Sequence, residues 1–341
     1  MNKSFSLYTA SIRKYIQNYL ISQIADLREI NQWGNDVITR LEKFASTGKL
    51  IRGCLVLFSH AAYRGRRKNE AMKVAGAIEL IHAGLLIHDD IMDRDPLRRG
   101  SPSIYQQYQN LAETGYFKNP SHYGISQGIN AGDLCFFLAF ALLGNLKSFS
   151  RELTRVVIAQ MQDISTSSTL TYPSYQEIIN LYRYKTARYT FSLPLSLGAL
   201  LAGQKEPELK QLENLGETMG LIFQMKDDEL GIFGNAKQTG KPVGSDIREN
   251  KKTLYYYYLM QKTDKVEKHK LLSIFGKAEL TLKDLDAVRG AIKRLKIDRL
   301  IDGEIKRLAK QAKLQISKLT VGAQAKEELL SLLAFAQTRN K

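Results

Sequence analysis

The sequence predicts an all-α fold. Apolar residues recur every three or four positions nearly throughout the chain, from Ile12 and Ile16 near its start to Leu333 near its end, which is the helical period. Strand-like alternation of apolar and polar residues is not sustained over any stretch. Two segments, AMKVAGAIELIHAGLLIHDDIMD and MGLIFQMKDDELGIF, are apolar around most of their circumference until a pair of acids appears. Helices of this kind belong in the centre of a bundle.

The scarcity of proline and of linker-like segments predicts one domain over residues 1–341. The sequence holds only 7 prolines, and no Ser/Gly/Pro-rich linker marks a place where one core ends and another begins. The opening residues lack the apolar core of a secretory signal, and no stretch approaches the roughly 20 apolar residues that span a bilayer. We therefore expect a cytoplasmic protein without a transmembrane segment. Cys54 and Cys135 lie in apolar runs and are expected to be buried thiols.

The formal charge of +16 has several interpretations. A basic surface attracts nucleic acid, anionic lipid or small phosphorylated substrates alike. Many lysines recur at helical spacing in the C-terminal third, for example in GEIKRLAKQAKLQISKL, which favours solvated helix faces. A nucleic-acid-binding role would explain the charge but not the acids on central helices. We therefore expect no nucleic-acid partner.

The first acidic motif is Asp89, Asp90 and Asp93, which form D-D-x-x-D. Pro96 ends the helix a few residues later. Asp89 and Asp93 are one turn apart on the same helix face, and Asp90 is about 100° away, so their oxygens can converge. Such a cluster suits Mg²⁺, which takes hard oxygen ligands and is completed by substrate phosphates. By itself, however, an acidic run is usually a solvated helix end.

A second pair, Asp227 and Asp228, follows an apolar helix that carries Gln224 one turn earlier. We expect the two acidic clusters to face each other across a cavity. Carboxylates near the C-terminal end of a helix are disfavoured by its dipole unless cations compensate. The chain supplies such cations in short motifs elsewhere: Lys49, Arg52, Arg98, Arg99, Lys185 and Lys241. Magnesium with arginine and lysine clamps is how a protein holds a diphosphate.

Together these motifs resemble the polyprenyl synthetase family from about Gly48 to Lys252. GKLIR resembles the family's G-K-x-x-R, ELIH its E-x-x-H, DDIMDRDPLRRG its first aspartate-rich motif, QMQD its Q-x-x-D, KT its lysine-threonine pair and FQMKDD its second aspartate-rich motif. The resemblance implies the isoprenoid synthase fold, a bundle of long helices around a central active-site cavity. It also implies a Mg²⁺-dependent prenyltransferase that condenses isopentenyl diphosphate head-to-tail with an allylic diphosphate. Homodimers are the habit of this family.

The resemblance also implies roles for individual residues. The metal ligands would be Asp89, Asp93 and Asp227, supported by Asp90 and Asp228. The allylic diphosphate would be contacted by Arg98, Lys185 and Lys241. Isopentenyl diphosphate would be bound by Lys49, Arg52, His82 and Arg99. The catalytic residues would be Lys185, Thr186 and Gln224. Lys185 would bind the departing diphosphate, and the oxygen dipoles of Thr186 and Gln224 would flank the allylic cation. The departing diphosphate would take the proton, so no side-chain base is required.

One departure from the family pattern and one group of residues that sets product length complete the comparison. Gly231 stands where many members have a third aspartate, and Asp246 is a candidate to supply the missing charge. The growing product should run along the first acid-tipped helix toward its N-terminus, past the residues that precede Asp89: Leu85, Gly84 and Ile81. Because no aromatic residue blocks this level, we predict geranylgeranyl diphosphate as the product. Farnesyl or longer products stay open as alternatives, since a large residue of another helix, such as Phe58, could form a floor.

Competing functions make different demands on the sequence. A class I terpene cyclase would share the first aspartate motif and the helical fold but would need no isopentenyl diphosphate site. A non-catalytic partner subunit of a synthase typically loses its aspartates, and here both acidic pairs are intact. The sequence therefore favours the synthase.

Overall fold

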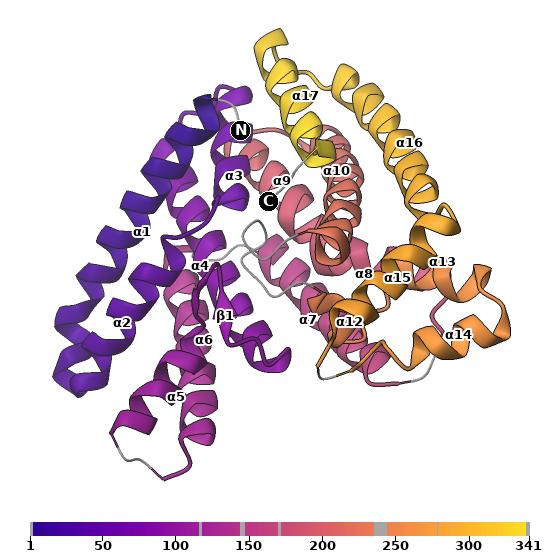
Figure 1. Cartoon of the computed structure of the whole chain (residues 1–341). Coiled ribbons are helices and arrows are strands. Elements are labelled where there is room, and N and C mark those ends of the chain that lie inside the picture. Colours follow the sequence, from indigo (N-terminus) through magenta and orange to yellow (C-terminus); the bar gives the residue numbers. More distant parts are fainter. Residues whose placement is uncertain are drawn as a thin grey trace. The chain divides into compact units, whose positions relative to one another are not determined.

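A computed structural model describes residues 3–115, 118–143, 147–169, 172–234, 244–277 and 279–338. Helices dominate these residues, which confirms the predicted all-α class (Figure 1). The chain divides into two compact units: the first comprises residues 1–146 and 197–204, and the second comprises residues 147–196 and 205–341. The single domain expected from the sequence stays a prediction, and the units are described separately.

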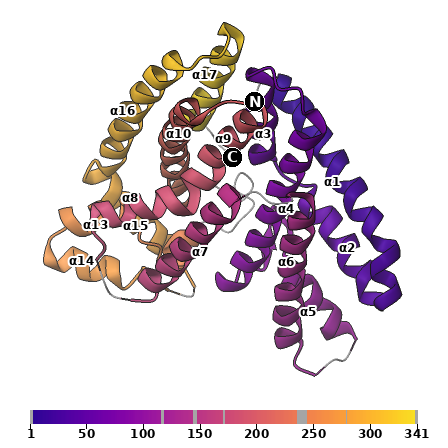
Figure 2. The same ribbon diagram turned by 180° about the vertical axis from the view of Figure 1, so that it is seen from behind.

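The first unit is a set of packed helices with one short hairpin. Its elements are α1 (Lys3–Ile30), α2 (Gln32–Ala45), α3 (Ile51–Ala62), α4 (Lys68–Met92), β1 (Leu97–Arg98), β2 (Ser101–Pro102), α5 (Ile104–Thr114) and α6 (Pro120–Leu143). α1 packs against α2, α3 and α4, and α4 packs against α6, which also contacts α5 (Figures 1 and 2). The helix predicted before Pro96 is therefore the central α4.

Glycines bring α4 and α6 close together. An added Cβ at Gly84 would lie 2.8 Å from the carbonyl oxygen of Gly132 and 2.7 Å from the ring of Phe136. Likewise, an added Cβ at Gly132 would lie 2.2 Å from the imidazole of His88. Residues without a Cβ are needed here because packed interiors leave no spare volume.

Both α4 and α6 are long and apolar enough to cross a membrane by length and composition, so the expectation that no stretch reaches that length is corrected. The apolar window of α4 is 67% buried, and the helix packs against α3 and α6. The core helix of a water-soluble protein passes the same test. The composition of these helices is thus weak evidence for a membrane span.

The second unit is built around the long helix α10. Its elements are α7 (Lys147–Ser167), α8 (Tyr175–Leu181), η1 (Tyr182–Ser192), α10 (Glu206–Phe233), α12 (Ser245–Arg248), α13 (Leu254–Lys262), α14 (Lys265–Leu272), α15 (Leu282–Arg294), α16 (Ile297–Lys318) and α17 (Ala323–Thr338). Residues 193–196 of α9 (Leu193–Leu201) also belong to it, and the rest of that helix belongs to the first unit. α10 packs against η1, α16 and α17 (Figure 1).

The segment η1 is a π-helix of 11 residues, which the sequence did not predict. It packs very closely on α10: an added Cβ at Gly220 would lie 2.3 Å from the Cα of Ala187, and one at Gly216 would lie 2.5 Å from the Cα of Ser192. Two glycines one turn apart on α10 therefore let the two backbones approach. π-helical winding is rare and is found mostly at functional sites.

Candidate active site

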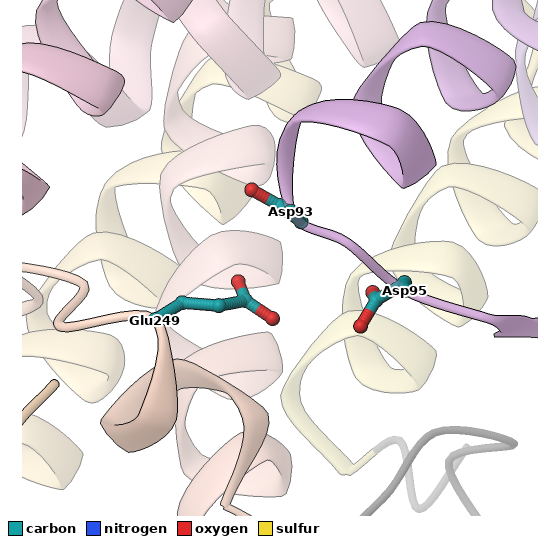
Figure 3. A group of neighbouring side chains, drawn as sticks. All are labelled: Asp93, Asp95 and Glu249. Atoms are coloured by element: carbon teal, nitrogen blue, oxygen red, sulfur yellow. The ribbon is translucent and has the colours of Figure 1, made fainter. Parts of the chain in front are cut away.

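The first acidic motif lies where α4 ends, as the sequence predicts. Asp93 caps the helix, and its N–H donates to the carbonyl oxygen of Asp89 at 2.8 Å. The Asp89 side chain is 24% exposed, whereas Asp90 is fully buried. Figure 3 shows Asp93 at the helix end and Asp95 in the segment that follows. Asp89 and Asp93 are thus accessible carboxylates, and Asp90 is not.

A hairpin after α4 places Arg98 against Asp90. The turn residues Arg99 and Gly100 have φ values of 54° and 78°, which is the pattern of a type I′ turn. The Nε of Arg98 donates to Asp90 at 2.6 Å, and its guanidinium lies 3.8 Å from Asp89. Burial alone would lower the pKa of Arg98, but the charge of Asp90 and its hydrogen bond raise it. Arg98 therefore neutralises the buried Asp90, and this ion pair makes the end of α4 tolerable for acids.

The neighbouring Arg99 lies against the turn that precedes α3. Its Nη1 donates to the carbonyl oxygen of Thr47 at 2.5 Å and contacts the Thr47 hydroxyl at 2.9 Å. Gly48 has a φ of 97°, and an added Cβ there would lie 2.7 Å from the Arg99 guanidinium. Only glycine satisfies both demands. The turn at Gly48 therefore leaves room for the Arg99 guanidinium. Lys49 and Arg52 lie on either side of the start of α3.

Arg99 lines a narrow crevice of the first unit together with His82 and Glu79. Burial and the guanidinium groups of Arg52 and Arg99 lower the pKa of His82 well below 6.5. The Glu79 side chain is buried, and its carboxylate accepts a hydrogen bond from the Gly53 N–H at 2.7 Å. Three of the four residues predicted to bind isopentenyl diphosphate are therefore coupled electrostatically. Glu79 was not predicted as a site residue, although its place in the ELIH motif was the available signal.

In the second unit, Asp163 holds two ammonium groups. It forms ion pairs with Lys185 of η1 and, at 3.2 Å, with Lys251. Burial alone would raise the pKa of Asp163, but the two lysines outweigh it and the pKa is lowered. One buried carboxylate thereby keeps two like charges side by side. Sequence reasoning missed Asp163 and Lys251 as site residues, although the QMQD motif contained the first of them.

The second acidic pair divides into one accessible and one buried carboxylate. Asp227 is exposed on α10, whereas Asp228 accepts hydrogen bonds from the Tyr182 hydroxyl and, at 2.8 Å, from Gln224. Burial and the charge of Asp246 raise the pKa of Asp228 well above its ordinary value. Thr186 donates to the Gln224 carbonyl oxygen at 2.6 Å. The chain Thr186, Gln224, Asp228 and Tyr182 therefore ties η1 to α10.

Asp246 lies where the third aspartate of the motif is missing. An added Cβ at Gly231 would be 2.4 Å from the Oδ2 of Asp246. The carboxylate of Asp246 thus occupies the space into which a side chain at position 231 would extend. A side chain at position 231 would therefore require the Asp246 carboxylate to move.

The chain-length prediction needs a correction at Gly84. This position packs against Gly132 and Phe136 of α6, so a large residue there would collide with α6 instead of filling an open pocket. An aromatic ring nevertheless lies at this level of α4, because α6 supplies Phe136. Of the other two predicted residues, Ile81 is fully buried and Leu85 is partly exposed.

Lys241 lies outside the described residues. The two acidic motifs belong to different units, so their predicted convergence on shared metal ions stays a prediction.

Comparisons with known proteins agree with the motifs described above. The model of the family described as polyprenyl synthetase matches residues 35–292. The chain belongs to the polyprenyl synthetase family. A short chain isoprenyl diphosphate synthase of Methanocaldococcus jannaschii is 33% identical over 73% of this chain and 72% of its own length. A geranylgeranyl diphosphate synthase of Sulfolobus acidocaldarius is 29% identical over 86% of this chain and 85% of its own length.

The fold also resembles that of family members of known structure. A geranylgeranyl pyrophosphate synthase of Corynebacterium glutamicum, solved with isoprenyl diphosphate and magnesium, superimposes with a TM-score of 0.90 and 27% identity. The superposition covers 98% of this chain and 99% of that one. The predicted family and isoprenoid synthase fold are therefore confirmed.

The environment of His82 predicts an acid-dependent loss of stability. Because the folded-state pKa is far below 6.5, the unfolded chain binds a proton below pH 6.5 that the folded chain does not. Lowering the pH from 6.5 to 5.5 should therefore cost wild type up to about 1 kcal/mol of unfolding free energy that His82→Gln does not lose. Urea unfolding at both pH values measures this difference. The exposed His122, changed to Gln, serves as the control, and an equal effect of both substitutions would contradict the assignment.

Proposed function

We propose that this protein is a Mg²⁺-dependent isoprenyl diphosphate synthase that makes geranylgeranyl diphosphate from isopentenyl diphosphate and an allylic diphosphate. The predicted enzyme class, a prenyltransferase, is confirmed by membership of the family. The observation that carries the proposal is the presence of two separate cationic sites. One contains Arg52, His82 and Arg99, and the other contains Lys185 and Lys251. Two diphosphate substrates require two such sites.

The acidic residues fit Mg²⁺ in kind. The accessible groups Asp89, Asp93 and Asp227 offer hard oxygen donors, whereas Asp90 and Asp228 are engaged with Arg98, Tyr182 and Gln224. Magnesium prefers one or two carboxylates completed by water and substrate phosphate, so a few accessible acids suffice. We propose that Asp89, Asp93 and Asp227 hold the metal, while Asp90 and Asp228 position their neighbours. Bound Mg²⁺ would supply charge stabilisation to the departing diphosphate.

The side chains of the chain perform the remaining work in this proposal. Lys185 exchanges Asp163 for the allylic diphosphate, which its ammonium can bind as the leaving group develops charge. The hydroxyl of Thr186 and the amide oxygen of Gln224 point their negative dipoles toward the allylic cation. Neutral His82, together with Arg52, binds isopentenyl diphosphate without adding a titrating charge. Lys49, Arg98, Arg99 and Lys241 complete the proposed diphosphate contacts.

Two alternative functions are weaker. A terpene cyclase has no use for the second cationic site around Arg52 and His82. A non-catalytic subunit would not need accessible carboxylates in both motifs. An assay for a labelled product from radiolabelled isopentenyl diphosphate, an allylic primer and Mg²⁺ separates these possibilities.

We propose that Phe136 contributes to the floor of the product pocket. Its ring lies against Gly84 and makes an edge contact with His88, with 5.4 Å between ring centroids. Phe58, the alternative considered from sequence, instead packs against Phe5 at 5.9 Å. One helical turn rises about 5.4 Å, close to one extended isoprene unit, so a single aromatic residue can decide one elongation step.

We further propose a cytoplasmic homodimer. α6 exposes Ile129, Phe137 and Phe140, which are 44%, 68% and 47% exposed. Large apolar side chains grouped on a helix face usually mark a protein interface. A second copy of the chain is the occupant that fits the symmetric assemblies common among such enzymes. Recovery of the protein with the membrane fraction would contradict the cytoplasmic part of the proposal.

Catalysis can be tested directly. Wild type with radiolabelled isopentenyl diphosphate, an allylic primer and Mg²⁺ should form a labelled prenyl diphosphate, and EDTA should abolish it. Asp89→Ala or Asp227→Ala should reduce turnover at least tenfold, about 1.4 kcal/mol in the barrier, because each removes a metal ligand. Asp286→Ala, an exposed acid of α15, is the control and should retain activity. Turnover above a tenth of wild type in either site variant would refute the metal assignment.

A second prediction concerns product length. Phe136→Ala should shift the product of wild type, expected to contain twenty carbons, toward longer chains, because the ring no longer covers Gly84. Chromatography of the dephosphorylated products measures the shift. Phe58→Ala is the matched comparison. Longer products from Phe58→Ala alone would place the floor on α3 instead.

The dimer predicts a mass of about twice 38.6 kDa by light scattering. Phe137→Glu should shift this mass toward the monomer because it places a charge in the apolar contact. A monomeric wild type at micromolar concentration would exclude the proposed interface.

A further inference from the structure

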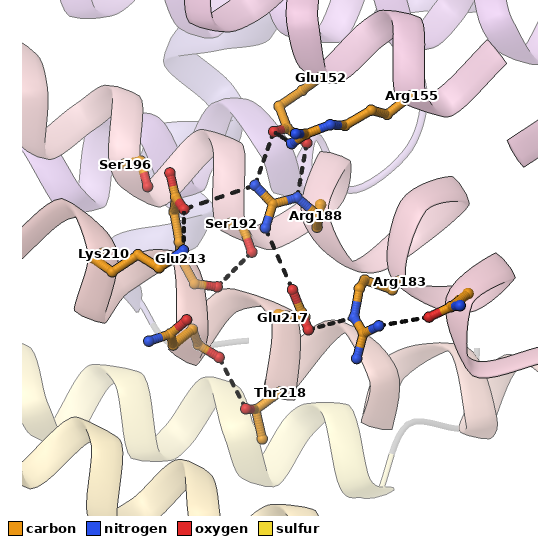
Figure 4. Close-up of polar contacts among 12 residues, drawn as sticks. Glu152, Arg155, Arg183, Arg188, Ser192, Ser196, Lys210, Glu213, Glu217 and Thr218 are labelled. Carbon is orange, nitrogen blue, oxygen red and sulfur yellow. Dashed lines mark hydrogen bonds and ion pairs between the residues drawn. The ribbon is translucent and has the colours of Figure 1, made fainter. Parts of the chain in front are cut away.

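A charged network lies beside η1, outside the family motifs (Figure 4). It joins residues of α7, η1 and α10: Glu152, Arg155, Arg183, Arg188, Lys210, Glu213 and Glu217. None of the functional roles described above uses these side chains. Their arrangement nevertheless surrounds the segment that carries Lys185 and Thr186.

Glu217 of α10 bridges the two arginines of η1. Its Oε1 accepts a hydrogen bond from the Nε of Arg183 at 2.6 Å, and its Oε2 accepts one from the Nη1 of Arg188 at 3.4 Å. Figure 4 shows both guanidinium groups turned toward this carboxylate. Arg188 also donates from Nε and Nη2 to Glu152 of α7, at 3.0 and 2.9 Å. Two neighbouring helices thus hold η1 through its arginines.

The bridge depends on the winding of η1. Arg183 and Arg188 are five residues apart, which in an α-helix would separate them by about 140° around the axis. A π-helix closes its hydrogen bonds over five residues, so positions five apart come close to alignment. One carboxylate can therefore meet both arginines when the segment is π-wound. Rewinding to an α-helix would turn one of them away.

The catalytic residues lie inside this interval. Lys185 and Thr186 stand between the two arginines in sequence, and the segment rests on α10 where Gly220 faces Ala187. Their directions are set by the winding of the same residues. Thr186 meets Gln224 and Lys185 meets Asp163 in the π-wound state.

The central ion pair of the network is largely shielded from water. The Arg188 side chain is 13% exposed and that of Glu152 is 7% exposed, so water competes little for their hydrogen bonds. Although burial alone would raise the pKa of Glu152, the hydrogen bonds and charge of Arg188 lower it. The carboxylate therefore remains charged at neutral pH. Forked arginine contacts add directional specificity that apolar packing lacks.

We propose that Glu217, by bridging Arg183 and Arg188, clamps η1 in its π-helical register and so positions Lys185 and Thr186 for catalysis. These three charged residues act through their neighbours and are positioning residues. The inference rests on the proposed function, since the positioned groups serve that reaction. It assigns a role to charges that the proposed metal and diphosphate contacts do not use.

The test compares Glu217→Gln and Arg188→Lys with wild type. Glu217→Gln keeps the shape but not the charge, and Arg188→Lys keeps the charge but not the fork. Each should lower the single-turnover rate of condensation at least tenfold while KM for isopentenyl diphosphate stays within twofold. Amide exchange of residues 182–192, measured without substrate, should accelerate at least tenfold. The double variant Arg183→Gln/Glu217→Gln should be no slower than Glu217→Gln alone, because both changes break one clamp.

Glu267→Gln is the matched control, because it removes the exposed ion pair with Arg294 and leaves η1 untouched. It should change neither the single-turnover rate nor the exchange. If Glu217→Gln lowers the melting temperature but keeps the wild-type rate and exchange pattern, the network is only structural and the clamp is refuted. Absence of product from wild type would refute the proposed function instead, and the exchange measurement would then judge the clamp alone.

Discussion

Carboxylates near the ends of two apolar helices are the constraint on which the rest of the site depends. The last turn of α4 contains no basic residue, so its dipole and its acids both place negative charge at one point. In each pair, one acid is buried against a specific partner. Asp90 meets Arg98, and Asp228 meets Tyr182 and Gln224. The remaining acids stay accessible, which is the state in which a metal can use them.

The same constraint explains why short turns accompany the motifs. The hairpin after α4 places Arg98 against Asp90, and the residue at its tip, Arg99, lies against the turn at Gly48. One feature thereby serves both the neutralisation of an acid and the construction of a cationic crevice. Removing either Arg98 or Asp90 would leave the other as a buried charge without compensation, which is costly in a protein interior.

Close backbone contact is the second organising feature. Gly84 with Gly132 in the first unit, and Gly216 with Gly220 in the second, let helices approach more closely than side chains would allow. Contacts of this kind fix the rotation of each helix about its axis. The directions of the functional side chains follow from that rotation. The charged network around Arg188 adds a further restraint where the winding of η1 is irregular.

The sequence by itself determined the all-α class, the end of α4 before Pro96, the two acidic motifs and the cationic motifs, because period, proline placement and residue order are local properties. It could not determine which acid of each pair is buried, since Asp89 and Asp90 differ only in the neighbours that folding brings to them. Nor could it show that Phe136 lies on Gly84, or that Asp246 fills the space beside Gly231, because these partners are distant in sequence. The π-winding of η1 was equally invisible, since it depends on contacts with α7 and α10. Tertiary packing decides these features because it fixes rotation and winding, which no local pattern encodes.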